Sequence, residues 1–285
     1  MGLPMASSLL AVGHMVLGYD LRTPPLSRLE SAGGRPMPSA VHAVAEADFV
    51  ITCLPDYAAV RKIWLDNPDL LRSLKRNAIL IDCSTIGVEE ARNVAGGVEA
   101  AGFSMLDAPV MGDPRDARAR LLSFAVGGSM AAFAEAKGLL EDMGERVVHV
   151  GKNGMGQAAV LCSQLMTTIN LLATAEAFAL GERLGLPAEK LFELASLSSA
   201  ASWSLVERCP QSGLVPEAPS NNLYQGGLPS AMALGQLRMA EQAGTKVDAR
   251  IPLTSLARDL YAEYCDTRDP KLDFSAIIQI LRNRS

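Results

Sequence analysis

The sequence has 285 residues, of which 49% are hydrophobic and 20% are charged, and its formal net charge is -5. This composition predicts a globular protein of one large or two ordinary domains and excludes a disordered chain. The acidic balance, with a pI near 5.3, argues against nucleic acid and anionic membranes as partners.

Cysteine and histidine usage favours neither a disulfide framework nor a metal site. The five cysteines are scattered and odd in number, and only three histidines are present. They predict buried thiols in a reducing compartment. No uninterrupted apolar run reaches the ~18 residues of a membrane span, and no basic segment precedes the first apolar run. We therefore expect a cytoplasmic protein, with a mitochondrial presequence ahead of Met1 left open.

The chain opens on a small-residue helix, a glycine turn, a short apolar run and an acidic residue. The helix is expected at residues 5–11, the apolar run at 15–19, and the acidic residue is Asp20. Helix, turn, strand and carboxylate in this order form the second half of a nucleotide-binding βαβ unit.

The rest of the first half alternates between predicted strands and predicted helices. The expected strands cover residues 49–53, 77–83, 103–110, 121–128 and 146–151, with helices at 88–102 and 131–144. Strands that read as continuous apolar runs are typical of a parallel sheet covered on both faces. Residues 1–150 therefore predict a doubly wound α/β domain.

After Gly156 the alternation stops and the remaining segments read as helices. Residues 157–184 are almost free of proline and glycine, and predict one long helix that is apolar nearly all round. We expect it to be buried between two domains or two subunits. Further helices are predicted at 187–199, 229–244, 252–264 and 273–283, so that residues 151–285 form an all-α domain.

Short motifs along the whole chain resemble the 3-hydroxyacid dehydrogenase family, which includes 3-hydroxyisobutyrate and 6-phosphogluconate dehydrogenases. The motifs are, in chain order, MGLPMASSLL, GHMVLGYD, CLP, IDCSTI, LDAPV, GMGQAA, AEA, YQGG and DFSAII. Residues 216–227 look most like 3-hydroxyisobutyrate dehydrogenase. The resemblance implies a Rossmann-type domain, a helical domain, and oxidation of a hydroxyl beta to a carboxylate with NAD or NADP.

The family's glycine turn is matched only from its end. The pattern Gly-x-Gly-x-Met-Gly-x-Pro-Met-Ala aligns from Met1 onward, with Gly2 as its third glycine and Leu3 and Pro4 after it. The first strand and the two glycines that face the pyrophosphate have no counterpart in the sequence. Tight dinucleotide binding is therefore not expected of this chain, and a late start and a real truncation both stay open.

Other cofactor positions are implied by the resemblance. Asp20 stands at the ribose-reading position and favours NAD, whereas Arg22 is able to accommodate the 2′-phosphate of NADP. Leu54 and Pro55 match the loop beneath the adenosine half, and Thr85 matches the loop near the nicotinamide ribose. Ordinary roles for these residues, such as a helix cap at 84–85, remain alternatives.

The implied substrate positions depart from the family. Ser84 is matched, but Met111 replaces the serine that donates to the substrate carboxylate, ahead of Gly112. Asp113 replaces a glycine and adds repulsion. The nearby arginines are either an alternative anion clamp or solvated surface residues; they are Arg115, Arg118 and Arg120.

The implied proton relay is also substituted. In the pattern Gly-x-Gly-x-x-x-Lys-x-x-Asn-Asn, the lysine position is Val160 and the asparagine positions are Ser163 and Gln164. A later family lysine reaches the cofactor, and this chain has Gly235 at its position. Trp203 matches an aromatic residue near the family's substrate pocket, or is an ordinary core residue.

Three hypotheses follow. The chain is an NAD(P)-dependent oxidoreductase acting on a small carboxylate, carbonyl or imine substrate with another proton donor or water. Alternatively, it is a catalytically silent relative with a structural or regulatory role, or a product with no function of its own. In each case, the long apolar helix predicts a homodimer or larger assembly. We expect no nucleic acid, membrane or metal as a partner.

Overall fold

The computed structural model describes residues 1–282 and divides into two compact units, Met1–Val160 and Leu161–Ser285. The boundary lies ten residues after the predicted one at 150. The shift arises because the first turn of the long helix is hydrogen-bonded to unit 1, as described below. Asn283, the last residue of the helix predicted at 273–283, lies outside the described residues.

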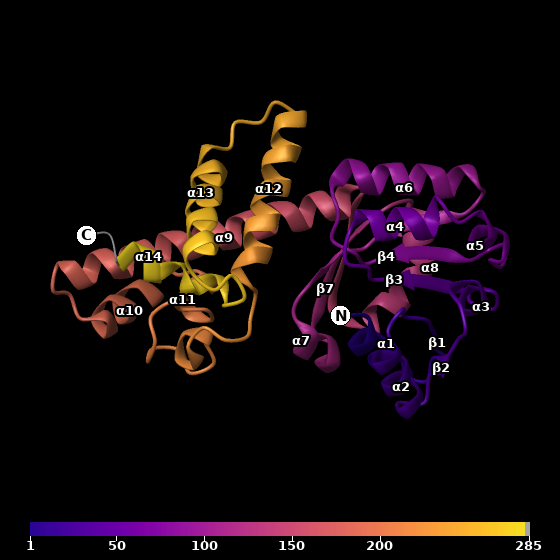
Figure 1. The fold of residues 1–285 in the computed structure, drawn as a ribbon, viewed down its shortest axis with the longest axis horizontal. Coiled ribbons are helices and arrows are strands. Elements are labelled where there is room, and N and C mark those ends of the chain that lie inside the picture. Colours follow the sequence, from indigo (N-terminus) through magenta and orange to yellow (C-terminus); the bar gives the residue numbers. More distant parts are fainter. Residues whose placement is uncertain (283–285) are drawn as a thin grey trace. The chain divides into compact units, whose positions relative to one another are not determined.

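Unit 1 alternates between strands and helices as the sequence predicts (Figure 1). Its elements are α1 Gly2–Ala11, β1 Leu17–Gly18, α2 Thr23–Ser31, β2 Arg35–Pro36, α3 Ala40–Val44, β3 Phe49–Thr52, α4 Tyr57–Trp64, α5 Pro68–Arg72, β4 Ile79–Asp82, α6 Val88–Ala100, β5 Ser104–Asp107, β6 Val110–Met111, α7 Pro114–Ala119, β7 Leu122–Gly127, α8 Met130–Glu141 and β8 Gly144–Gly151.

Polar side chains begin many of these helices. Ser39, Asp56, Asn67 and Ser129 each accept a hydrogen bond from a backbone N–H in the first turn of the helix that follows. Such caps satisfy donors that have no partner within the helix. The helix starts are thus encoded locally by the sequence.

The strands form two separate sheets. β1 and β2 pair in parallel, and a six-stranded sheet has the order β3-β4-β5-β7-β6, with β8 beside β7. The predicted parallel pairing holds for β3, β4 and β5 and for β7 with β8, whereas β7 runs antiparallel to β5 and β6. Only ten residues connect β6 to β7, which is shorter than a parallel crossover requires.

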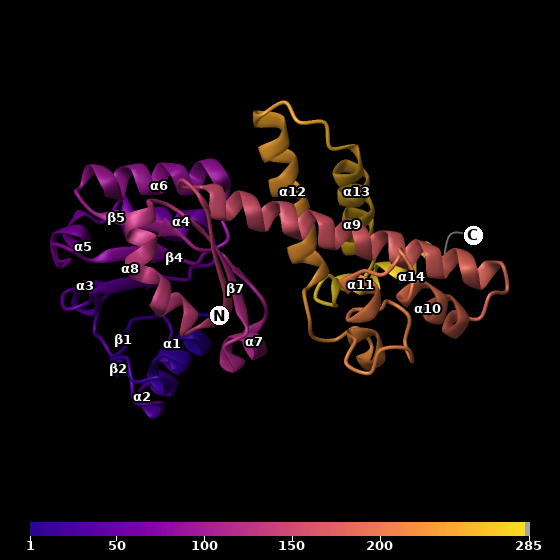
Figure 2. The same cartoon turned by 180° about the vertical axis from the view of Figure 1, so that it is seen from behind.

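Helices cover both faces of the six-stranded sheet, as expected of a doubly wound fold. Along β4, Ile79 and Ile81 pack into a core with α1 and α8, whereas Leu80 packs into a core with α4 and α6. Figures 1 and 2 show α4 and α8 on opposite faces of the sheet. The alternation of side chains along a strand produces these two cores.

Unit 2 is helical. Its elements, beginning with the helix that leaves unit 1, are α9 Met155–Arg183, α10 Ala188–Ser196, α11 Trp203–Val206, the 3-10 helix η1 Pro219–Asn222, α12 Ser230–Lys246, α13 Pro252–Thr267, the 3-10 helix η2 Phe274–Ile277 and α14 Ile278–Arg282. One core joins α9, α12 and α13 to η2 through residues such as Phe178, Leu237, Tyr261 and Phe274.

The long helix α9 is only partly buried within the single chain, and its predicted burial between two domains or two subunits stays a prediction. Met166 and Leu180 are 58% and 57% exposed, although Leu171 and Ala175 are fully buried. Within residues 1–282, α9 is the one helix long and apolar enough to cross a bilayer, by length and composition alone. A core helix of a globular protein meets the same criterion, so this property does not indicate a membrane protein.

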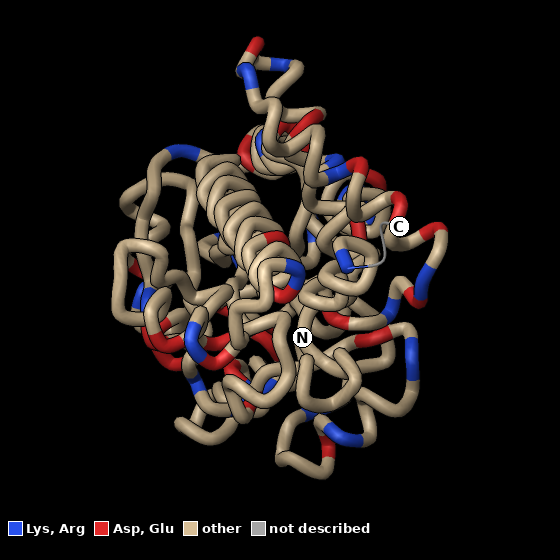
Figure 3. The backbone as a smooth tube through the Cα atoms, turned by 90° about the vertical axis from the view of Figure 1, so that its left-hand side faces the viewer, with Lys and Arg blue, Asp and Glu red and all other residues tan. Residues whose placement is uncertain are grey.

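The remaining expectations concern thiols and charge. All five cysteines are free; Cys83 and Cys209 are buried, but Cys162 is exposed, contrary to the prediction of buried thiols. Lys and Arg are interspersed with Asp and Glu along the chain (Figure 3).

Candidate functional site

The N-terminus of α1 lies against the end of β3. A Cβ added at Gly2 would lie 3.8 Å from Cβ of Cys53, an ordinary contact, so close packing does not demand glycine there. Met1 caps α1 without a side-chain hydrogen bond, and no acidic residue lies in the first turn, which contains Leu3 and Pro4. Free backbone N–H groups at a helix N-terminus favour an anionic group.

The loops after β3 and β4 are fastened to each other. Leu54 N–H donates to Ser84 Oγ at 2.9 Å, and Ser84 Oγ donates to Asp82 Oδ1 at 2.6 Å. Ser84 is 2% exposed, so its hydroxyl serves the loops of the protein. Pro55 and Thr85, one residue further along each loop, are exposed.

Asp107, at the end of β5, holds the first turn of α9. Its Oδ1 accepts from Gly154 N–H at 2.7 Å and its Oδ2 accepts from Gln157 N–H at 3.0 Å. The carboxylate therefore caps α9 from a neighbouring strand. Burial raises the pKa of Asp107, and these backbone donors oppose that rise.

The side chain of Gln157 continues this connection. Its Nε2 donates to Ser84 O at 2.7 Å, and its Oε1 accepts from Ile86 N–H at 3.2 Å. Gln157 is 2% exposed. The loop that presents Thr85 is thus held on both sides by one buried amide.

Asp82 is a buried carboxylate without a cationic partner among the described residues. Its Oδ1 accepts from Thr52 and Ser84, whereas its Oδ2 is buried and has no hydrogen-bond partner. Burial raises the pKa of Asp82, and the hydrogen bonds from Ser84 and Thr52 oppose the rise.

The two residues assigned to ribose recognition interact with each other. Asp20 Oδ1 accepts from the backbone N–H of Arg22 at 2.8 Å and from its Nε at 3.4 Å. The acidic and basic groups that the resemblance implies at the ribose position therefore stand side by side after β1.

The segment from Met111 to Arg120 is built around a short helix. Met111 is half-buried, and a Cβ on Gly112 would lie 2.8 Å from Leu122 Cδ2. Asp113 caps α7 and pairs with Arg115 at 2.9 Å, while Arg120 ends α7 in the left-handed region with φ 62°. Arg120 Nε donates to Asp142 O at 2.9 Å, so this guanidinium is engaged by the protein's own backbone.

The residues at the implied proton-relay positions share one face of α9. Val160 is 3% exposed, and Ser163 and Gln164, three and four residues later, are half-buried. Val160 closes unit 1, whereas Ser163 and Gln164 belong to unit 2. The buried position carries an apolar side chain with no titratable group.

The other candidates lie in unit 2. Gly235 is on α12, where an added Cβ would meet nothing within 4 Å. Trp203 begins α11, is 49% exposed, and has the guanidinium of Arg208 5.3 Å from its ring centroid. Trp203 is thus not a core residue of unit 2.

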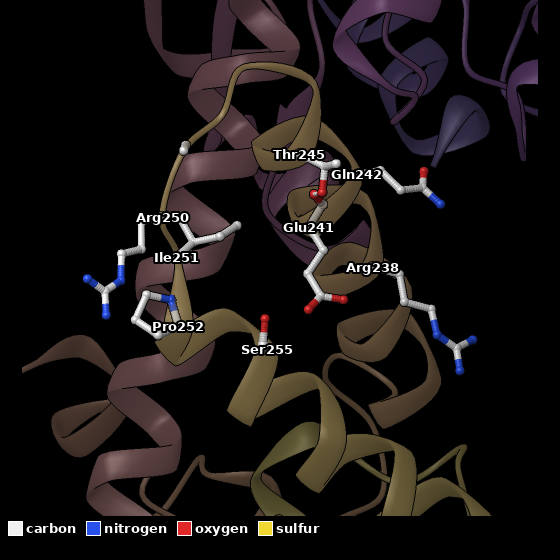
Figure 4. A pocket seen from close by; sticks show the side chains of 9 residues that line it. Arg238, Glu241, Gln242, Thr245, Arg250, Ile251, Pro252 and Ser255 are labelled. Atoms are coloured by element: carbon white, nitrogen blue, oxygen red, sulfur yellow. Dashed lines mark hydrogen bonds between the residues drawn. The ribbon is translucent and has the colours of Figure 1, made fainter.

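A cavity of about 570 Å³ lies in unit 2 between α12 and the start of α13 (Figure 4). Glu241 and Ser255 point towards its centre, whereas Arg238 and Arg250 point away on opposite sides. It contains none of the candidate residues. Within residues 1–282, no group of three His, Cys, Asp or Glu side chains is arranged to hold a metal ion.

Sequence analysis missed Asp82, Asp107 and Gln157 as functional positions. The available signal was an acidic residue closing each of two apolar strands, ILID and SMLD, because a carboxylate at a buried strand end requires partners. Which partners these are depends on contacts distant in sequence.

Comparison with known proteins matches each of the two units to a protein family. Residues 1–151 match the family described as the NAD binding domain of 6-phosphogluconate dehydrogenase. Residues 154–281 match the family described as NAD-binding of NADP-dependent 3-hydroxyisobutyrate dehydrogenase.

Full-length relatives agree. A probable 3-hydroxyisobutyrate dehydrogenase of Mycobacterium tuberculosis is 39% identical over 100% of this chain and 96% of its own length. The 3-hydroxyisobutyrate dehydrogenase of Pseudomonas aeruginosa is 38% identical with the same coverage. The M. tuberculosis 3-hydroxyisobutyrate dehydrogenase structure solved with L-serine has a TM-score of 0.94 at 38% identity, covering 99% of this chain and 96% of that chain.

The fold, a Rossmann-type domain followed by a helical domain, and these matches place the chain in the class of NAD(P)-dependent dehydrogenases. Within that class, the chain belongs to the 3-hydroxyisobutyrate dehydrogenase-like family.

Replacing Asp107 by alanine is expected to destabilise the protein. The substitution leaves the N–H groups of Gly154 and Gln157 without their charged acceptor, at a cost of about 1.5–3 kcal/mol. Chemical denaturation measures this change. Asp48→Ala, which removes an exposed ion pair with Lys75, is the matched control and should cost little. Equal stability of the two variants would contradict the assigned role.

Replacing Asp82 by asparagine is expected to change the pH dependence of stability. Because the folded pKa is raised, the folded protein binds the Asp82 proton more tightly than the unfolded chain, and stability falls as pH rises from about 4, the ordinary carboxyl range, through the raised pKa. The amide of the asparagine variant has no such proton to lose. Denaturation from pH 4 to pH 8 should show a smaller loss of stability in the variant. A wild-type-to-variant difference that is constant across this range would refute the assignment.

Proposed function

We propose that the chain is an NAD(P)-dependent oxidoreductase of its family that acts on a small carboxylate, carbonyl or imine substrate without a lysine proton relay. The observation that carries the proposal is Val160. Val160 is buried on α9, three residues after Gln157, whose backbone N–H is hydrogen-bonded to the Asp107 carboxylate.

The cofactor supplies hydride chemistry when bound, and the chain supplies positioning. The uncapped N–H groups of α1 fit a pyrophosphate, and exposed Thr85 lies on a loop fixed by Gln157. Asp20 favours NAD, because a carboxylate accepts from the ribose 2′-hydroxyl and repels a 2′-phosphate. Its contact with Arg22 weakens that preference.

The substrate side argues for a change of chemistry. Met111 offers no hydrogen bond to a carboxylate, which removes roughly 1–3 kcal/mol of binding relative to a buried donor. Relatives of this chain are named 3-hydroxyisobutyrate dehydrogenases, and one was solved with L-serine. We propose that this chain oxidises such hydroxyacids poorly.

A catalytically silent subunit is the second candidate. It is favoured by the coincidence of Val160, Met111 and Gly235, since all three substitutions remove a polar function and none disturbs the scaffold. Gly235 leaves open space where a longer side chain would fit.

Steady-state assays distinguish the two functions. NADH or NADPH oxidation with small carbonyl and imine substrates, compared with NAD reduction by 3-hydroxyisobutyrate and L-serine, tests the proposal. Turnover of the carbonyl or imine substrates with little hydroxyacid oxidation is expected of the first function. Absence of turnover with the whole panel assigns the second.

We further propose that the chain forms a homodimer through α9, as a protein of the cytoplasm. An exposed apolar stripe runs along α9 and onto the residue directly after it, at spacings of seven, four, three and four residues. It is made of Met166, Ala173, Ala177, Leu180 and, just past the helix end, Leu184. This spacing is that of a helix seam that packs on a partner helix.

A charge within this stripe is expected to weaken the dimer. Leu180→Glu places an anion in the apolar seam, and sedimentation equilibrium should then show a monomer over concentrations at which the wild type is a dimer. Glu176→Gln, on an exposed position of the same helix, serves as control and should leave the dimer intact. A wild type that stays monomeric at every concentration would contradict the proposed seam.

A further inference from the structure

One half-buried arginine of unit 2 has no acceptor for its guanidinium. Within residues 1–282, the half-buried arginines are Arg208, Arg258 and Arg282. Arg258 and Arg282 form ion pairs with glutamates, at 3.1 Å and 2.8 Å respectively. Arg208 has neither an ion pair nor a hydrogen bond from its guanidinium to another residue of this range. A guanidinium carries five N–H donors and no acceptor, so those of Arg208 remain available to a ligand.

The guanidinium of Arg208 lies over an aromatic ring. Its Cζ is 5.3 Å from the ring centroid of Trp203, within the range of a cation–π contact. Trp203 is itself 49% exposed. The N–H groups of a guanidinium lie in its own plane, so that contact with a ring leaves them able to bind a carboxylate. The two residues therefore present an oriented cation beside an accessible apolar surface.

The protein carboxylate that interacts electrostatically with Arg208 is already satisfied. Burial raises the pKa of Asp273, and hydrogen bonds from Ser275 and Leu228, together with the charge of Arg208, oppose the rise. Asp273 is fully buried, and it accepts from Leu228 N–H at 2.9 Å and from Ser275 N–H at 3.0 Å. In the described part of the chain it forms no ion pair with Arg208, so it does not occupy the guanidinium.

The segment that carries Trp203 and Arg208 is anchored on α9 beside a candidate site residue. Ser204 Oγ, one residue after Trp203, donates to Thr167 O at 3.2 Å. Thr167 Oγ1 in turn donates to Ser163 O at 3.0 Å. Thr167 is one helical turn, about 6 Å along the axis, after Ser163. Figures 1 and 2 both show α11 beside α9. The aromatic ring and its cation therefore lie in the same region of unit 2 as Ser163.

We propose that Arg208 binds the carboxylate of the substrate, with Trp203 against the apolar part of the same molecule. The inference rests on the proposed function and narrows its substrate to a small molecule that carries a carboxylate. A guanidinium pairs with a carboxylate through two parallel N–H···O bonds, which gives both affinity and orientation. None of the other candidate substrate residues carries a positive charge; they are Ser84, Met111, Gly112 and Ser163.

The test is equilibrium binding of two probes that differ in charge, 3-hydroxyisobutyrate and its uncharged amide. Isothermal titration calorimetry on the full chain gives both affinities, and added NADH prevents oxidation of the probe. We expect saturable binding of the carboxylate and at least about tenfold weaker binding of the amide, because hydrogen bonds between ionised groups are roughly twice as strong as neutral ones.

Two variants of Arg208 separate charge from hydrogen-bond geometry. Arg208→Gln removes the charge and should weaken carboxylate binding at least about tenfold, whereas Arg208→Lys keeps the charge, loses the paired N–H groups and should weaken it less. The affinity for the amide should change little in either variant. This split between the two probes is not expected of a residue that only stabilises the fold.

Arg268→Gln is the matched control, because it removes the charge of an exposed arginine of the same unit. Both probes should bind this variant as they bind the unaltered chain. Should Arg208→Gln fail to fold, the comparison of the two probes on the unaltered chain still tests the proposal.

Binding and turnover distinguish this inference from the proposed function. If the carboxylate binds through Arg208 and no substrate is turned over, Arg208 is a carboxylate-binding residue of a silent protein and the proposed activity is wrong. If carbonyl or imine compounds are turned over and the carboxylate does not bind, the activity stands and the inference is wrong. Equal affinity for the two probes, or unchanged carboxylate affinity in Arg208→Gln, would also overturn the inference.

Discussion

The buried carboxylate of Asp107 is the contact on which the arrangement of unit 1 depends. It lies at the end of β5 and binds the first backbone N–H groups of α9 through Gly154 and Gln157. Once α9 starts at this point, Gln157 reaches the loop after β4, and Ser84 connects that loop to the one after β3. The carboxyl ends of three neighbouring strands are thereby joined to one helix, the arrangement in which α/β folds bind ligands.

The departures from the family pattern that we propose lie beside this network and leave it unbroken. Val160 follows Gln157 by three residues and is an apolar residue in a buried position, at no cost to packing. Gly235 stands in open space on α12, and Met111 is half-buried in a short strand. A scaffold kept intact while polar functions are lost is the physical basis for proposing altered or absent turnover.

Much of the fold could be predicted from sequence because apolar runs and polar caps act locally. The strand ILID lies within the strand predicted at residues 77–83. The antiparallel direction of β7 could not be predicted, since strand direction depends on the length of a connection whose helix α7 was not recognised. The faces of α9 that pack within the chain could not be told from composition, because an all-round apolar helix does not show which faces meet a partner.

The candidate site was predicted unevenly for a related reason. Motif positions suggested Thr85, Asp20 and Val160, which stay predictions. They did not suggest the partners of Asp107 and Asp82, which are set by contacts tens of residues apart. Ser84 was assigned to substrate, and its hydroxyl is instead engaged by Leu54 and Asp82. Residue type at a motif position does not reveal whether a side chain is already engaged within the protein.

The most direct test of the central claim is the rate of 3-hydroxyisobutyrate oxidation by Val160→Lys and by the unaltered chain, with saturating NAD. Val160→Met controls for the change in side-chain size. If the chain retains its family scaffold and lacks only the proton relay, the lysine variant should be faster by about 10²-fold or more, and Val160→Met should not. A wild type that already oxidises this substrate efficiently, and loses the activity on introduction of lysine, would contradict the account.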